Sequence, residues 1–136
     1  MRQEGNYEEA FKYFTKAVEL GSVEAHNCLA FLYNQGLGVE KDVKRELYHL
    51  EEAAVGGHPS ARYILGCNEI ANGNNERAVK HLIIATKLGY DDALDAVKAG
   101  FAEGIVSKEV HDTAILGYQA AIDATKSKQR EEAPIP

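Results

Sequence analysis

The chain has 136 residues, of which 45% are hydrophobic and 26% are charged, and its formal net charge at pH 7 is −6. This composition is typical of one ordinary globular domain. The negative charge argues against non-specific binding to nucleic acid, which requires lysine and arginine to displace phosphate counterions. Because no apolar run approaches the roughly 20 residues of a membrane span, we expect neither nucleic acid nor a membrane as a partner.

Helical periodicity predicts seven helices and no strand. In the first, residues 7–20, Phe11 and Phe14 lie on an apolar face, and Asn6 is placed to cap the N-terminus. The polar segment 127–136 contains two prolines and is expected to be disordered. The other helices are expected at residues 24–35, 43–55, 59–72, 76–88, 91–103 and 108–126.

The predicted helices form repeating pairs. The alanines let paired helices approach closely, and each glycine follows a helix where the chain needs a left-handed conformation. The pattern predicts a right-handed α/α superhelical solenoid of about three hairpins over residues 1–126, with 108–126 as a C-terminal capping helix. Three columns share steps of 36 and then 32 residues: Ala17, Ala53 and Ala85; Gly21, Gly57 and Gly89; Ala25, Ala61 and Ala93.

A longer turn joins the second and third predicted helices. In it, Gly36 and Gly38 allow positive φ, Val39 packs onto the core and Asp42 caps the next helix. The combination resembles the Sel-1-like repeat, a relative of the tetratricopeptide repeat, and the resemblance covers about residues 7–104. The matching residues are Tyr33-x-x-Gly36-x-Gly38-Val39-x-x-Asp42, followed by Ala53-Ala54 and Gly57.

The resemblance implies a non-catalytic scaffold or adaptor that binds a protein or peptide partner. The chain is also similar to a set of algal Sel-1-like proteins, some of which carry a zinc-binding RING segment, and this implies the substrate-recognition part of a ubiquitin-ligase-type assembly as an alternative. The register makes residues 7–20 a second helix without its first-helix partner. Either the natural chain is longer or another chain covers this helix, so a homo-oligomerisation module is a further alternative.

In this class of solenoid the first helices of the pairs line the concave face. Phe31 and Tyr63 are either aromatic anchors for a partner or part of the packing between first helices. The groove-facing positions lie two residues before and after the column of Leu29, Leu65 and Val97, with Ala99 among them. The predicted partner-binding residues are Asn27, Phe31, Asn34, Tyr63, Cys67 and Asp95.

His49 and His81 occupy equivalent positions in successive second helices and suggest a metal site. Equivalent residues in stacked repeats lie about 10 Å apart, whereas zinc needs its nitrogen ligands about 2.0–2.1 Å from one centre. We therefore expect half-buried, hydrogen-bonded structural histidines and neither metal nor cofactor. Gly36-Leu37-Gly38 lacks the third glycine and the preceding strand of a dinucleotide loop, and no motif indicates an enzyme.

The two cysteines, Cys28 and Cys67, are too few for a disulfide framework. The N-terminal residues contain no apolar run of the kind found in secretory signals, so we expect a reducing, cytoplasmic compartment. Both cysteines fall on predicted first helices, where they would pair, act as nucleophiles or, as is more common for free cysteine, be buried as small apolar side chains.

Overall fold

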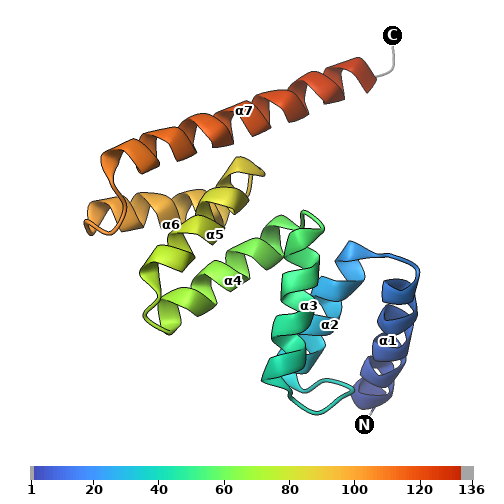
Figure 1. Ribbon diagram of the computed structural model, residues 1–136. Coiled ribbons are helices and arrows are strands. Elements are labelled where there is room, and N and C mark those ends of the chain that lie inside the picture. The colour runs from blue at the N-terminus through green and yellow to red at the C-terminus, as the bar shows by residue number, and fades with distance from the viewer. Residues whose placement is uncertain (1, 133–136) are drawn as a thin grey trace. The chain divides into compact units, whose positions relative to one another are not determined.

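The computed structural model describes residues 2–132, with side chains for residues 5–129. Within this range the regular structure consists of seven helices, and no residue lies in a strand (Figure 1). The all-α prediction is confirmed, and α2 to α6 begin and end within one residue of their predicted bounds. The helices are α1 (Arg2–Glu19), α2 (Val23–Gln35), α3 (Val43–Val55), α4 (Pro59–Ala71), α5 (Asn75–Lys87), α6 (Asp91–Ala102) and α7 (Lys108–Glu132).

The two terminal helices are longer than predicted. Since α1 begins at Arg2, Asn6 lies inside the helix and does not cap it. At the other end α7 continues to Glu132, so residues 127–132 are helical, and residues 133–136 lie outside the described part of the chain. The physical reason is propensity: lysine, glutamine, arginine and glutamate are good helix formers, so a polar segment continues a helix without burying any surface.

The chain packs as two compact units that are divided between Leu65 and Gly66, inside α4. In the first unit α1 packs on α2, and α2 and α3 lie side by side (Figure 1). In the second unit α5 packs on α6, and both contact α7. The predicted single solenoid domain over residues 1–126 spans both units, and its superhelical course stays a prediction.

The core of the first unit forms where α2, α3 and the first half of α4 meet. Leu50 and Ala53 of α3 are 2% and 0% exposed, and they pack with Ala30, Ala61 and Leu65. Three of these five residues are alanines. The small side chains allow the helix axes to approach toward the short end of the usual 8–10 Å range.

The core of the second unit combines one large side chain from each of α5 and α6 with a small one from α7. Leu82, Val97 and Ala114 are all buried. Thr86 is also buried, and its hydroxyl donates to the Leu82 carbonyl oxygen at 2.7 Å, so burial leaves no unpaired donor there. Gly66 of α4 belongs to this packing, since an added Cβ would lie 3.1 Å from Leu82 Cδ2.

Candidate partner-binding site

The turn between α2 and α3 is shaped by two glycines and an N-cap. Gly36 and Gly38 have φ values of 68° and 73°. The Asp42 carboxylate accepts a hydrogen bond from the Arg45 backbone N–H at 3.1 Å and so caps α3, while Val39 is half-buried. At the ends of the second helices the three glycines of the repeat column also have positive φ: Gly21 (93°), Gly57 (90°) and Gly89 (87°).

Gly38 has a second role that the sequence pattern did not reveal, because it lies against the backbone of α1. A Cβ added at Gly38 would lie 2.7 Å from Glu8 N and still closer to the Tyr7 carbonyl group. Because Gly38 has no side chain, the turn between α2 and α3 can close onto α1. Gly36 is different, since the nearest atom to its added Cβ is Cγ of the flexible Lys41 side chain at 3.0 Å.

Three of the predicted partner-binding residues lie on α2, in the first unit. Asn27, Phe31 and Asn34 follow one another at helical spacing and so share a face of the helix. Phe31 is 56% exposed. Asn34 is exposed and donates from Nδ2 to Oε2 of Glu46 on α3 at 3.0 Å. Asn27 is half-buried, and its Oδ1 is buried without a hydrogen-bond partner.

The other predicted residues lie on α4 and α6. Tyr63 is half-buried and belongs to the first unit, together with the α2 residues. Cys67 is half-buried, Asp95 and Ala99 are exposed, and all three belong to the second unit. A continuous concave surface through all of these positions therefore stays a prediction, whereas the shared face on α2 belongs to the first unit alone.

A histidine pair joins α2 to α3, and sequence reasoning missed one of its members. Nδ1 of His26 and Nδ1 of His49 lie 2.9 Å apart, a distance at which one ring donates and the other accepts. Tyr33 stacks on His49 with ring centroids 5.7 Å apart, and Tyr48 meets both imidazoles edge-on. His49 is thus half-buried and hydrogen-bonded, as expected. The only sequence signal for His26 is its position three residues before the buried Leu29.

His49 has a lowered affinity for a proton in the folded chain. Burial lowers the pKa of His49 below its ordinary value, and His26 and Arg45 lower it further, while Glu52 opposes them. A hydrogen bond between two imidazoles requires at least one neutral ring, because two protonated rings would have no acceptor between them. A pair with both rings protonated would therefore lose this hydrogen bond, while the apolar contacts between α2 and α3 remain.

We expect the free energy of unfolding to fall as the pH is lowered from 7.5 to 5.5. A histidine with a depressed folded-state pKa binds protons more readily when unfolded, so the loss begins near the unfolded value of about 6.5 and is complete below the folded value. Urea unfolding at several pH values measures this loss, and NMR titration places the pKa of His49. His49→Gln should flatten the curve, and an unchanged pH dependence in that variant would contradict the assignment.

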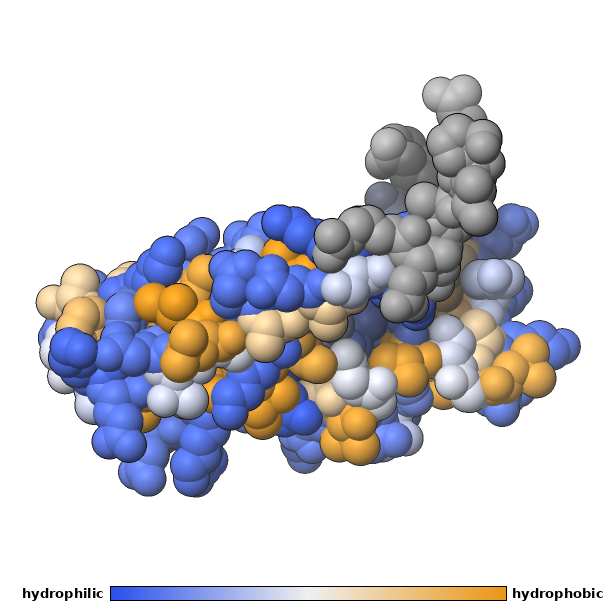
Figure 2. All heavy atoms as spheres, turned by 90° about the horizontal axis from the view of Figure 1, so that it is seen from above, coloured by the Kyte–Doolittle hydropathy of each residue, from blue (hydrophilic) through white to orange (hydrophobic). Residues whose placement is uncertain are grey.

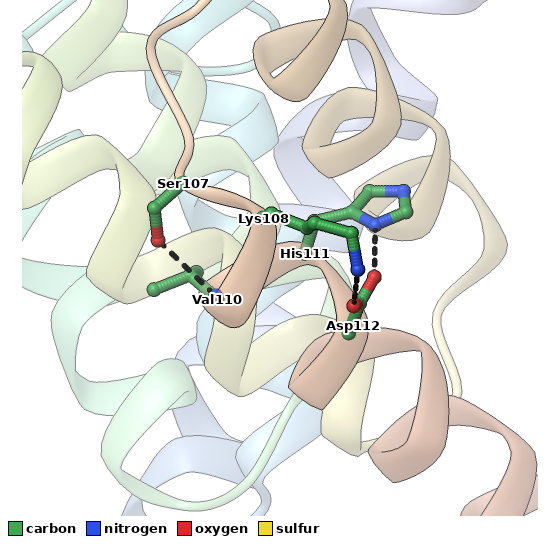
Figure 3. A network of polar contacts seen from close by, with 5 residues as sticks. All are labelled: Ser107, Lys108, Val110, His111 and Asp112. Atoms are coloured by element: carbon green, nitrogen blue, oxygen red, sulfur yellow. Dashed lines mark hydrogen bonds and ion pairs between the residues drawn. The ribbon is translucent and has the colours of Figure 1, made fainter.

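A second polar cluster forms the first turn of α7 (Figure 3). The Ser107 hydroxyl accepts a hydrogen bond from the Val110 backbone N–H at 3.2 Å. Lys108 Nζ and His111 Nδ1 donate to the two carboxylate oxygens of Asp112 at 2.8 and 2.9 Å, and these bonds, that of Lys108 first, lower the pKa of Asp112. Since the His111 ring also stacks on Phe101 at 4.3 Å, the cluster fastens the start of α7 to the end of α6.

Neither cysteine is in a disulfide, and the surroundings of Cys28 disfavour its reactive form. Cys28 and Cys67 are free and half-buried. Burial raises the pKa of Cys28, and the Glu24 carboxylate raises it further, which disfavours the reactive thiolate.

Among residues with described side chains, no group of three His, Cys, Asp or Glu is placed to hold a metal ion. None of the described helices is both long and apolar enough to cross a membrane.

Large apolar side chains also reach the surface outside the predicted site. On the face drawn in Figure 2 the hydrophobic groups form separate patches among hydrophilic ones. Scattered apolar residues are normal on a protein surface, so exposure alone marks no site. The most exposed of the large apolar residues are Leu20, Val55, Leu116, Tyr13 and Val43.

Comparison with known families shows a match that covers more than half of the chain. The Sel1 repeat model matches residues 2–22, 23–58 and 59–90. These segments divide the chain as the repeated columns do: α1 in the first, α2 with α3 in the second, and α4 with α5 in the third. The resemblance drawn from the turn signature is thereby confirmed. No curated protein matches the chain.

Proposed function

The chain belongs to the Sel1 repeat family, whose repeats are generally protein-interaction modules and typically not catalytic, and on this premise we propose that it is a scaffold or adaptor. It binds a segment of another protein on the concave face formed by the first helices of its repeats. In the first unit the predicted partner-binding residues are Asn27, Phe31 and Asn34 on α2 and Tyr63 on α4; those in the second unit are Cys67 on α4 and Asp95 on α6.

The observation that carries the proposal is that one face of α2 combines the exposed Phe31 ring with the buried, unpaired Oδ1 of Asn27. Its neighbours Ala30 and Leu32 are buried, so the core of α2 is complete without the 56% exposed phenylalanine ring. Large aromatic side chains are frequent anchors at protein interfaces. The buried Oδ1 of Asn27 lacks a hydrogen-bond donor, and a backbone N–H of an extended partner segment would supply one.

We expect the double variant Phe31→Ala with Tyr63→Ala to weaken partner binding tenfold or more, because truncating an anchor residue costs about 2 kcal/mol or more and about 1.4 kcal/mol corresponds to tenfold. Affinity capture from native lysate with wild-type and variant baits identifies the partner, and calorimetry then measures the dissociation constant. Tyr48→Ala is the matched control, since Tyr48 on α3 has the same exposure as Phe31.

Helicity decides between the two interpretations of these aromatic residues. Circular dichroism of the double variant should match that of the wild type if Phe31 and Tyr63 contact a partner. A loss of helicity would show that they belong to the packing between first helices. Retained helicity together with unchanged partner binding would remove the concave face from the proposal.

The α1 surface favours homo-oligomerisation as a second candidate function. Phe14 and Ala17 are only half-buried, whereas their register equivalents Leu50 and Ala53 are 2% and 0% exposed. A second copy packed on α1 would give Phe14 and Ala17 comparable burial. Light scattering across a range of concentrations tests this, and a molecular mass of one chain throughout would exclude it.

Co-capture of ubiquitin-ligase subunits in the lysate experiment would instead support the substrate-recognition role.

A further inference from the structure

The last interhelical turn is a shortened version of the turn between α2 and α3. Both turns open at a glycine with positive φ, Gly36 at 68° and Gly104 at 78°. Both close at a side-chain N-cap, Asp42 before α3 and Ser107 before α7. Only two residues separate Gly104 from Ser107, whereas five separate Gly36 from Asp42, so the last turn lacks three residues.

The missing residues matter because of what the longer turn covers in the first unit. There, Gly38 closes onto the backbone of α1 at Tyr7. The repeat steps of 36 and 32 residues carry Tyr7 to Val43 and then to Asn75, the first residue of α5. In the second unit the shorter turn therefore faces the start of α5 with less chain to cover it.

An apolar pocket lies in the second unit where the register places this gap. Its volume is about 200 Å³, and Asn75 and Glu103 supply polar groups to its lining. An adjoining hollow shares Asn75, Val79, Ile105 and Val106 with it. We call the two together the turn pocket. The apolar side chains that line its deeper part include Ile70, Val79, Leu82, Ala99, Ile105 and Val106.

We propose that the turn pocket receives a branched aliphatic side chain from an extended segment of a protein partner, which takes the place of the missing turn residues. In the longer turn the corresponding stretch contains Val39, which is half-buried. An apolar cavity of about 150 Å³ accepts a benzene-sized molecule, so 200 Å³ suits one valine, isoleucine or leucine side chain. Ile70 and Ile105 are 49% and 47% exposed, and an inserted side chain would cover both.

The charges beside the pocket favour a basic residue next to the aliphatic one. Two carboxylates line the turn pocket, Glu103 in its deeper part and Glu76 in the adjoining hollow, against one cation, Lys80. The neighbouring Arg77 does not shift this balance, because it lies 3.6 Å from the Glu69 carboxylate and is paired with it. A lysine or arginine of the partner segment would therefore complement the pocket.

This inference rests on the proposed protein-binding function and adds to it a contact surface separate from the Phe31 face. A random peptide library displayed on phage, selected against the whole chain, is the probe. We expect the enriched peptides to share a valine, isoleucine or leucine adjacent to a lysine or arginine. The best peptide, synthesised with a fluorophore, then gives dissociation constants by fluorescence polarisation.

Two variants block the turn pocket in different ways, and we expect each to weaken peptide binding tenfold or more. Val79→Phe fills the pocket from α5, and Ile105→Glu places a charge at its exposed mouth. Ile84→Phe is the control, since Ile84 lies on the same helix, is exposed and does not line the pocket. Circular dichroism shows whether each variant folds, and Ile105→Glu decides if Val79→Phe does not.

The outcomes separate this inference from the proposed function. If the enriched peptides lose affinity in the Phe31→Ala, Tyr63→Ala double variant but not in the two pocket variants, the turn pocket is excluded and the concave face is supported. If no peptide is enriched, or the enriched peptides lack the aliphatic and basic pair, the inference is wrong. Affinity capture from lysate with the wild-type chain then still tests the proposed function independently.

Discussion

Gly38→Ala should lower the free energy of unfolding by about 2–5 kcal/mol, whereas Gly36→Ala should lower it by about 1–2 kcal/mol. Both substitutions force alanine into a left-handed conformation, at φ of 73° and 68°. The difference between them comes from packing. The new methyl group at Gly38 would meet the backbone of Tyr7 and Glu8, which cannot rotate away, while at Gly36 it would meet the flexible Lys41 side chain.

Urea unfolding followed by circular dichroism measures both values under the same conditions. Gly36→Ala serves as the control for the conformational cost, so the difference between the variants reports the close approach of the turn to α1. Equal losses for the two variants would show that this turn does not press on α1. A larger loss of stability for Gly38→Ala than for Gly36→Ala would show that the turn between α2 and α3 covers α1. This would support the argument for the turn pocket, in which the shorter turn between α6 and α7 covers less of α5.

Leu50→Ala should lower the free energy of unfolding by about 2–5 kcal/mol, the range for removing a large apolar side chain from a packed core. Leu50 is 2% exposed and contacts the cluster that joins α2, α3 and the first half of α4. Its removal leaves a cavity at the centre of the first unit. The neighbouring alanines have little side chain with which to fill that cavity, so we expect a value in the upper half of the range.

Leu20→Ala makes the same chemical change on the surface and is the matched control. Leu20 is 85% exposed, so its truncation should change the free energy of unfolding by no more than about 0.5 kcal/mol. Thermal and urea unfolding of both variants provide the comparison. A large loss at Leu20 would instead indicate that this residue is covered in solution, and light scattering of the same sample would show whether a second copy of the chain covers it.

The repeated helices could be predicted from the sequence because their signals are local. Apolar spacing, helix-ending glycines and the Asp42 cap act over a few residues, and they located α2 to α6 within one residue of the observed bounds. The columns containing Ala53 and Ala85 also predicted where helices approach closely, and both alanines are fully buried. The ends of the chain were harder, since charged helix formers extend α7 without any apolar pattern.

From the sequence alone, residues of the candidate site could be placed together only where they lie on the same helix. The spacing of Asn27, Phe31 and Asn34 on α2 is sufficient to place them on a shared face, but it gives neither the exposure of Phe31 nor the bond from Asn34 to Glu46. Those two properties depend on how much of each side chain the neighbouring helix covers.

The sequence by itself therefore determined the helices, their pairing into repeats and the family, because each follows from short-range propensity and from columns of similar residues. Only the tertiary structure decided that His26 meets His49, that Gly38 touches α1 and that a pocket opens beside Asn75. These features depend on the distance and rotation between helices that are far apart in the sequence. A change of a few ångströms in that packing makes or removes a hydrogen bond or a cavity, and helical periodicity alone does not encode it.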